Sequence, residues 1–253
     1  METVSPNERI DEINENLRLI CRKDGLTFGT DAYLLSAYAK ASHRSVAADL
    51  GSGTGVIALL CGAREKFKKI FAVEIQPDFA ELIRRNAALN GLDGMIEPIC
   101  ADVRDIKPDV LGGEVDVVLS NPPYMKKNAG KRNETDEKYI ARHEVCGDIY
   151  DFCSAAARIL RYGGTFLCVY RPDRLTELLD AMRKNALEPK KMTFVHADGN
   201  TPPSVVLIEA KKGGACGLKV TPPLFLYREE INENGSRTMT DAALKIYENC
   251  SFE

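Results

Sequence analysis

The clearest chemistry in this chain belongs to four consecutive residues, Asn121, Pro122, Pro123 and Tyr124. The amide oxygen of Asn121 and the carbonyl oxygen of Pro122 are two adjacent acceptors, and the prolines stiffen the loop that holds them. Such a pair can hold both N–H groups of a planar, conjugated amine while its nitrogen becomes tetrahedral and gains positive charge. Tyr124 offers a π face on which a flipped base can stack. All four residues are therefore predicted to be catalytic.

A glycine-rich turn lies 70 residues before this loop. Residues 49–55, DLGSGTG, end a short apolar run and precede a segment with helical periodicity. A strand that ends in a carboxylate, a glycine turn and a helix N-terminus let the backbone approach a ligand closely. Val56 occupies the sixth position of a Gly-x-Gly-x-x-Gly pattern, which counts against NAD or FAD. The ligand contacts predicted here are Asp49, Gly51, Ser52, Gly53 and Gly55.

A second strand end adds another carboxylate. Glu74 ends an apolar run 23 residues after Gly51, where an acidic side chain can accept both ribose hydroxyls of an adenosine. Together with the glycine turn, this pattern resembles the cofactor loop of S-adenosylmethionine (SAM) methyltransferases, in which the acid before the turn helps hold the methionine ammonium. The resemblance implies that Asp102 accepts from the adenine amine, that Val103 packs on the ring and that Ile75 also contacts the cofactor.

Three flanking segments make the resemblance closer. The NPPY run is similar to the catalytic loop of methyltransferases that act on a planar amino nitrogen. Residues 24–35, 141–144 and 222–227 resemble the bacterial tRNA-valine adenine-N6 methyltransferases, the YfiC-like family. The resemblance covers nearly the whole chain, although Met239 and Asp241 stand where the family pattern has tyrosine and glutamate.

This resemblance implies both a cofactor and a substrate. The cofactor would be SAM, with further contacts from Thr30, Asp31 and Asn121. The reaction would be methyl transfer to the N6 amine of an adenine in RNA, namely the adenine beside the anticodon of a valine tRNA.

Two other functions share parts of the pattern. A glutamine-N5 methyltransferase of the release-factor type also carries an NPPY loop, because a side-chain amide is planar and conjugated. Those enzymes usually have a separate helical N-terminal domain, whereas this chain has 45 residues there, including a strand-like run at 17–21. A non-catalytic SAM-fold module that binds RNA is the third possibility, and the intact Asp49, Glu74, Asp102 and Asn121 argue against it.

The elements that must position these residues alternate between strand and helix. Repeated βα units predict a doubly wound, mostly parallel α/β sheet of seven strands, the Rossmann-like fold of SAM methyltransferases. The turn at 198–203 is too short for a crossover helix, so the last two strands should pair antiparallel. Residues 1–45 are expected to form a small cap on a methyltransferase domain at 46–253. The predicted strands are 46–50, 70–75, 95–103, 115–120, 165–170, 190–197 and 203–209, and the predicted helices are 55–65, 77–91, 148–160 and 172–185.

Composition sets outer limits on function. With 34 Lys and Arg against 37 Asp and Glu, the net charge is −3, so RNA contact must come from a local basic patch. The N-terminus lacks the apolar core of a signal peptide, and no run reaches the roughly 18 apolar residues of a membrane span. Eight scattered cysteines indicate reduced thiols rather than a disulfide framework. A cytoplasmic monomer without a membrane contact is expected.

One polar segment follows the catalytic loop. Its cations suit contact with RNA phosphates, although a solvated loop has the same composition. The side chains predicted to bind RNA are Lys126, Lys127, Lys131 and Arg132. His143, Cys146 and Cys153 follow with a spacing that fits no closed tetrahedral zinc site, so no metal is expected.

Overall fold

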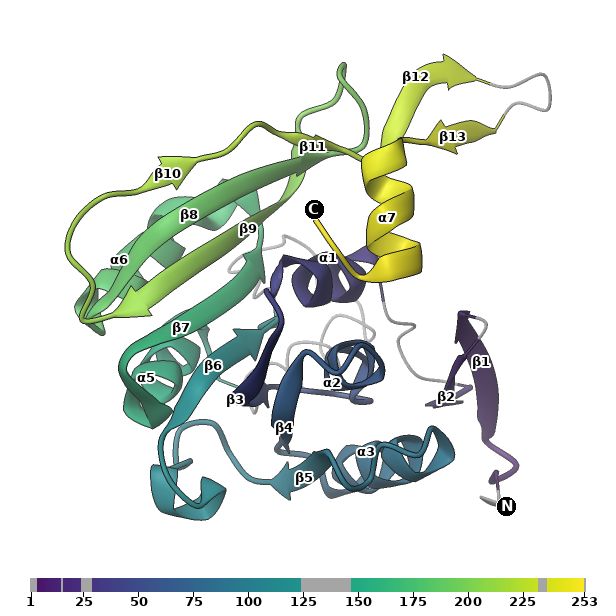
Figure 1. Cartoon of the computed structure of the whole chain (residues 1–253), viewed down its shortest axis with the longest axis vertical. Coiled ribbons are helices and arrows are strands. Elements are labelled where there is room, and N and C mark those ends of the chain that lie inside the picture. Colours follow the sequence, from purple (N-terminus) through teal and green to yellow (C-terminus); the bar gives the residue numbers. More distant parts are fainter. Residues whose placement is uncertain (1–3, 15, 24–28, 124–146, 232–235, 253) are drawn as a thin grey trace, which may run out of the picture.

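A sheet of nine strands runs through the computed structural model, which describes residues 4–14, 16–23, 29–123, 147–231 and 236–252 (Figure 1). In spatial order its strands are β10 (Lys219–Val220), β8 (Leu187–His196), β9 (Pro203–Lys212), β7 (Leu160–Tyr170), β6 (Val115–Ser120), β3 (Ser42–Leu50), β4 (Phe67–Glu74) and β5 (Ile96–Cys100), and β11 (Leu224–Phe225) pairs with β8 beside β10.

The predicted mostly parallel α/β sheet is confirmed. Strand β9 pairs antiparallel with both β7 and β8, as the short turn at 198–203 required, and every other pair in the sheet is parallel. The seven predicted strands are all present. Strands β10 and β11 add two residues each along the edge of β8. Such short strands have no alternating pattern for a sequence to display, yet they cover an edge that would otherwise expose unpaired backbone groups.

Helices cover both faces of the sheet (Figure 1). Their apolar residues fall into two separate clusters, one on each face. The first cluster includes residues of α1 (Thr30–Tyr38), α2 (Val56–Ala63), α3 (Pro77–Leu89) and α7 (Asp241–Asn249), and the second includes residues of α5 (Ile149–Ile159), α6 (Leu175–Lys184) and the 3-10 turn η1 (Pro108–Leu111). The helix predicted at 172–185 is divided, because a 3-10 turn η2 (Pro172–Arg174) precedes α6.

An N-terminal hairpin of β1 (Glu8–Asn14) and β2 (Leu17–Arg22) packs on α3 through side-chain amides. Asn86 accepts from the N–H of Ile20 at 2.7 Å and donates to its carbonyl at 3.2 Å. Asn90 binds Arg18 in the same two ways, at 2.9 and 2.7 Å. Asn86 and Asn90 are four residues apart on the helix, a rise of about 6 Å, and Arg18 and Ile20 are two residues apart on the strand, a rise of about 6.6 Å. The two amides are therefore spaced to reach alternate residues of β2.

A second hairpin extends from the body near the C-terminus (Figure 1). Its strands are β12 (Tyr227–Ile231) and β13 (Arg237–Met239), and α7 follows with the Thr240 side chain as its N-cap. The N–H of Tyr227 donates to the carbonyl of Ala197 at 2.8 Å, which ties this hairpin to the loop after β8. No helix within the described ranges is long and apolar enough to cross a membrane.

Candidate functional site

The predicted site residues meet at one edge of the sheet. Leu50, the last residue of β3, pairs with Val73 of β4 on one side and with Ser120 of β6 on the other. Glu74 pairs in turn with Cys100, the last residue of β5. From β3 the chain continues outward through β4 to β5, and it then returns from β5 to β6 on the other side of β3. Open α/β sheets bind ligands at such a switch point, outside the carboxyl ends of the strands.

The glycine turn has a backbone that only glycine adopts readily. Gly51, Gly53 and Gly55 have φ angles of 73°, 57° and 86°, all in the left-handed region. The N–H groups of Gly51 and Ser52 both donate to the carbonyl of Val73 at 3.0 Å, so the turn lies against the end of β4. A Cβ atom added at Gly51 would lie 3.1 Å from the Phe152 ring. The turn is therefore a fixed and closely packed cradle.

Asp49 is a buried carboxylate with an unused acceptor. It is fully buried at the end of β3, and its Oδ2 accepts from the Ser52 hydroxyl at 2.6 Å. Its Oδ1 makes no hydrogen bond of normal distance and angle with the described residues. Burial raises the pKa of Asp49 to about 7; the Ser52 hydroxyl and, more weakly, the backbone of Ala58 oppose this rise, and the charge of Glu74 adds to it. A buried carboxylate in this condition suits a cationic ligand group, since an ammonium would satisfy both its charge and its free oxygen.

Glu74 is buried too, but backbone groups hold both of its oxygens. Oε2 accepts from the N–H of Gly53 at 3.0 Å, and Oε1 accepts from the N–H of Gln76 at 2.9 Å. Burial raises the pKa of Glu74, while these backbone hydrogen bonds act against the rise. Each oxygen keeps a further lone pair, so two adjacent hydroxyl groups can bind a carboxylate that is already fixed in place.

Asp102 follows β5 and has a different environment. The backbone N–H of Arg104 donates to its Oδ1 at 2.8 Å, and the Arg104 guanidinium binds both carboxylate oxygens. This guanidinium lowers the pKa of Asp102. Val103 beside it is buried, and its carbonyl accepts from Arg158 at 2.9 Å. The arginine partner was not predicted, because a neighbour two residues away carries no periodic signal.

Asn121 follows β6 directly, on the side of β3 opposite to Glu74. The end of β6 is fixed by the buried hydroxyl of Ser120, which donates to the carbonyl of Leu50 at 3.0 Å. Pro122 is buried, and Pro123 is half-buried. The predicted acceptor pair thus begins one interstrand spacing, about 4.8 Å, from the end of β3.

The remaining predicted contacts lie on other elements or outside the described residues. Thr30 and Asp31 begin α1, and the Thr30 hydroxyl accepts from Tyr247 of α7 at 3.0 Å. Ile75 is half-buried in the turn after β4. The residues that lie outside the described ranges are Tyr124, Lys126, Lys127, Lys131, Arg132, His143 and Cys146.

Comparison with known proteins identifies the family. The family model of the methyltransferase small domain matches residues 20–188. The chain belongs to this family. A tRNA1(Val) (adenine(37)-N6)-methyltransferase from Phocaeicola vulgatus is 32% identical over 186 residues, which make up 72% of this chain and 76% of the relative. One from an Enterobacter species is 28% identical over 216 residues, 79% of this chain and 86% of the relative. The predicted membership of the bacterial tRNA-valine adenine-N6 methyltransferases is therefore confirmed.

Solved structures agree on the fold. The crystal structure of a "predicted O-methyltransferase" from Agrobacterium tumefaciens superposes with a TM-score of 0.69 at 24% identity, covering 88% of this chain and 98% of that one. A tRNA m1G37 methyltransferase from Methanocaldococcus jannaschii gives a TM-score of 0.52 at 19% identity, covering 83% of this chain and 58% of that one. The sheet described above is thus a methyltransferase sheet.

This methyltransferase edge fits a SAM molecule on two structural grounds. The Oδ1 atom of buried Asp49 is a hydrogen-bond acceptor without a donor of normal geometry among the described residues, and the methionine ammonium of SAM would donate to it. The cradle formed by the glycine turn and the fixed carboxylate of Glu74 offers a place for a ribose. Neither feature depends on the family name.

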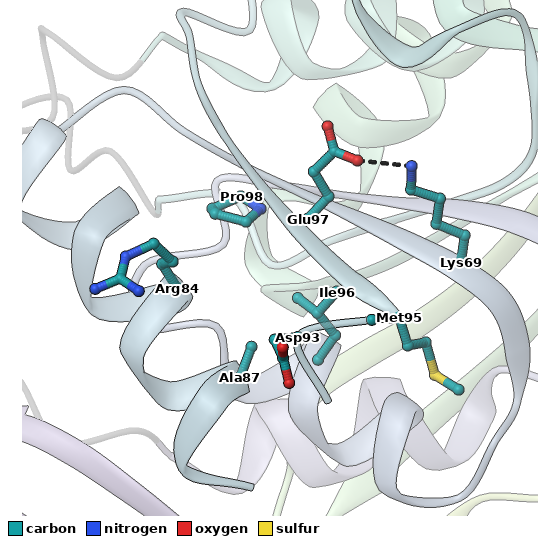
Figure 2. A pocket seen from close by; sticks show the side chains of 9 residues that line it. Lys69, Arg84, Ala87, Asp93, Met95, Ile96, Glu97 and Pro98 are labelled. Carbon is teal, nitrogen blue, oxygen red and sulfur yellow. Dashed lines mark ion pairs between the residues drawn. The ribbon is translucent and has the colours of Figure 1, made fainter. Parts of the chain in front are cut away.

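A hollow elsewhere on the methyltransferase contains none of the predicted side chains. It has a volume of about 180 Å³ and lies between α3 and β5 (Figure 2). Lys69 and Glu97 form an ion pair of 2.6 Å beside it, and Arg84 lines it while also binding Glu81 at 2.7 Å. Three of its charged side chains, those of Lys69, Glu97 and Arg84, are therefore already paired, and the hollow contains no residue of the candidate site.

Proposed function

We propose that this methyltransferase transfers a methyl group from SAM to the N6 amine of an adenine in tRNA, beside the anticodon. The observation that carries the proposal is the position of Asn121, which leaves β6 next to the glycine turn on β3. A loop built to hold a planar amine thereby begins beside a cradle built to hold a nucleoside with an ammonium group. Both similar proteins described above are named as enzymes of this specificity.

The cofactor contacts follow from the geometry of the edge. Asp49 would accept from the methionine ammonium, and the two oxygens of Glu74 would accept from the ribose hydroxyls. Asp102 would accept from the adenine amine through the lone pairs that Arg104 leaves available, and Val103 would pack on the ring. When bound, SAM supplies a methyl group activated by a sulfonium.

The acceptor side must make a poor nucleophile reactive. The lone pair of an adenine N6 is delocalised into the ring, so the nitrogen has to become tetrahedral before it can accept a methyl group. The amide oxygen of Asn121 and the carbonyl of Pro122 would hold its two N–H groups in that arrangement and stabilise the developing positive charge. The methylated ammonium is acidic and loses its proton readily, so no strong general base is needed. Tyr124 would stack on the flipped base.

The N-terminal hairpin bears on the competing glutamine methyltransferase. That class usually has a separate helical domain before the SAM domain. In this chain the corresponding segment contains β1 and β2, which lie on α3 rather than forming a helical bundle. The names of the two relatives support the RNA substrate over the protein substrate. The cations at 126–132 remain a proposed site of phosphate contact.

The decisive variant is Asn121→Ala. Loss of one acceptor from the transition state should slow methyl transfer by about a hundredfold or more, while SAM affinity stays nearly unchanged. Transfer is measured as N6-methyladenosine by mass spectrometry of nucleosides from a valine tRNA transcript, and SAM affinity by calorimetry. Normal turnover of the variant at saturating tRNA would contradict the proposed role. Methylation of a protein glutamine, with none of tRNA, would contradict the proposed substrate.

A further inference from the structure

An exposed aromatic ring lies at the carboxyl end of β8, and no step of the proposed reaction uses it. Phe225 of β11 pairs in register with His196, the last residue of β8. The centres of the two rings are 5.5 Å apart, and the rings are tilted by 55°. The Phe225 side chain remains 37% exposed, whereas Leu224 and Leu226 on either side of it are buried.

Hydrogen bonds fix the ring of His196 and the backbone that carries the Phe225 ring. The Nδ1–H of His196 donates to the carbonyl of Thr201 at 2.7 Å, since a carbonyl can only accept. The carbonyl of Phe225 accepts from the Thr240 hydroxyl at 2.7 Å, and the N–H of Leu226 donates to the carbonyl of His196 at 3.0 Å. A ring held in this way loses little conformational freedom when a ligand stacks on it.

The ring shares an edge of the sheet with the proposed catalytic loop. Strands β6, β7 and β8 run in one direction, so His196 and Asn121 both lie at carboxyl ends. The spatial order β8-β9-β7-β6 places three interstrand spacings between them. Strand β11 lies on the side of β8 that faces away from β9, which adds a fourth spacing. At about 4.8 Å for each spacing, Phe225 lies on the order of 19 Å from the start of the catalytic loop.

A cation is held at the same loop. Asp198 is buried two residues after His196, and it accepts from the Arg237 guanidinium at 2.6 Å. The Arg237 side chain is nevertheless 47% exposed, and a guanidinium carries five N–H donors. The ring contacts His196 and the arginine binds Asp198, two residues further along the same loop. An exposed ring and an arginine held at one loop can together bind the base and the phosphate of a nucleotide.

We propose that Phe225, supported by His196, stacks on a second nucleobase of the RNA and thereby sets the register of the strand relative to the flipped adenine. This inference rests on the proposed function. A separation of about 19 Å corresponds to about six nucleotides when bases stack with a rise of about 3.4 Å, and to fewer when the backbone is extended. The second base therefore lies within about six nucleotides of the target on the same strand.

The test is steady-state kinetics with a valine tRNA transcript. Phe225→Ala should raise the KM for tRNA about five- to a hundredfold, because a stacking surface is lost. The kcat at saturating tRNA and the Kd for SAM should stay unchanged, which also shows that the variant is folded. Phe225→Tyr should restore the KM, and Phe225→Leu should not. Tyr162→Ala is the matched control, because Tyr162 is a 76% exposed aromatic near the opposite, amino end of β7.

The outcomes separate this inference from the proposed function. If wild type methylates no tRNA, the proposed function is wrong and the inference falls with it. If wild type is active but the KM of Phe225→Ala for tRNA is within twofold of the wild-type value, only the inference is wrong, because the ring then contributes nothing to tRNA binding. Full rescue by Phe225→Leu would equally overturn the inference, since it would show a packing role. The stacked base can be identified with tRNA transcripts that each carry one abasic nucleotide. The right position would raise the KM of wild type by the same factor as Phe225→Ala does, and it would raise the KM of Phe225→Ala no further.

Discussion

The ends of β3 and β5 offer acidic residues to the same edge of the sheet, yet in opposite conditions. Asp49 at β3 is fully buried, keeps one oxygen without a hydrogen bond of normal distance and angle among the described residues, and has a pKa raised to about 7 by burial. Asp102 after β5 is partly exposed, has both oxygens bound by Arg104, and has a pKa lowered by that guanidinium. Glu74, on the strand between them, is buried and held by backbone N–H groups.

The difference shows that acidic residues of one cofactor site can contribute unequally to the affinity for the cofactor. A buried carboxylate that lacks a counter-charge destabilises the protein until a cation arrives, so the cation gains the full benefit of binding. A carboxylate already paired with an arginine at the surface has little more to gain. We therefore expect SAM affinity to depend strongly on the β3 end and weakly on the β5 end.

The largest effect is expected for Asp49→Asn. The variant keeps the shape and the acceptor for Ser52, but it leaves the methionine ammonium without a buried counter-charge. SAM should bind about a hundredfold or more weakly, because breaking a buried ion pair costs about 3–5 kcal/mol. Calorimetry measures this change. The control is Asp116→Asn, which alters a carboxylate near the amino end of β6 that binds Arg161 at 2.6 Å. An equal loss in both variants would show a general effect on folding.

Glu74→Ala should be the next in size. Two ribose hydroxyls would lose a charged acceptor, and hydrogen bonds to charged groups contribute about 1.5–3 kcal/mol, or roughly ten- to a hundredfold in affinity. Glu97→Ala serves as control, because Glu97 lies on the neighbouring strand, where it forms an ion pair with Lys69 (Figure 2). Unchanged SAM affinity in Glu74→Ala would remove this residue from the cofactor site.

SAM affinity measured over a range of pH tests the role of the Asp49 carboxylate in the wild-type protein. Asp49 has its pKa raised to about 7 in the absence of ligand, and SAM needs the charged form. SAM affinity should therefore fall as pH drops below about 7, by roughly tenfold for each pH unit. The fall should be absent in Asp49→Asn. An identical pH profile in both proteins would show that another group sets it.

The same group gives a stability prediction with the opposite sign. The folded protein holds the Asp49 proton up to about pH 7, whereas an unfolded chain releases it near the ordinary value of 3.8. The free energy of unfolding should therefore decrease as pH rises between these values. Asp49→Asn should lose this decrease and have a higher Tm than wild type at pH 8 without SAM. A lower Tm at that pH would contradict the burial argument.

The smallest effect is expected at the β5 end. Arg104→Gln would release the Asp102 oxygens, but the Arg104 side chain is 44% exposed and such a pair at the surface is worth about 0–1 kcal/mol. SAM affinity should rise by no more than about fivefold. Arg161→Gln is the matched control, since it breaks a similar exposed pair with Asp116 far from the cofactor edge. A hundredfold change in Arg104→Gln would show that the two strand ends matter equally.

The sequence predicts the strand ends well and their surroundings poorly. Asp49, Glu74 and Asn121 each follow an apolar run, so their common edge follows from strand periodicity alone. The third predicted strand, 95–103, is longer than β5, because Asp102 and Val103 belong to the turn that Arg104 stabilises. Partners such as Arg104 and Ser120 are set by side-chain direction after folding, which no period in the sequence reports.

Short strands and polar contacts across elements are the other gap. Strands β10 and β11 contain two residues each, too few for an alternating pattern. Asn86 and Asn90 lie four residues apart on α3, where the sequence shows only polar residues near the end of a helix. Their contact with β2 becomes visible only when the hairpin and the helix are seen together.

The amides of Asn86 and Asn90 also have a consequence for colloidal behaviour. Among the described residues β2 pairs with a strand, β1, on one side only, so its other side would present the N–H and C=O groups of Arg18 and Ile20 to another protein molecule. Such an open strand edge is a template for intermolecular β-pairing and aggregation. The two amides occupy these groups with side chains of α3, which cannot extend a sheet further. A helix thereby closes a sheet edge that no strand covers.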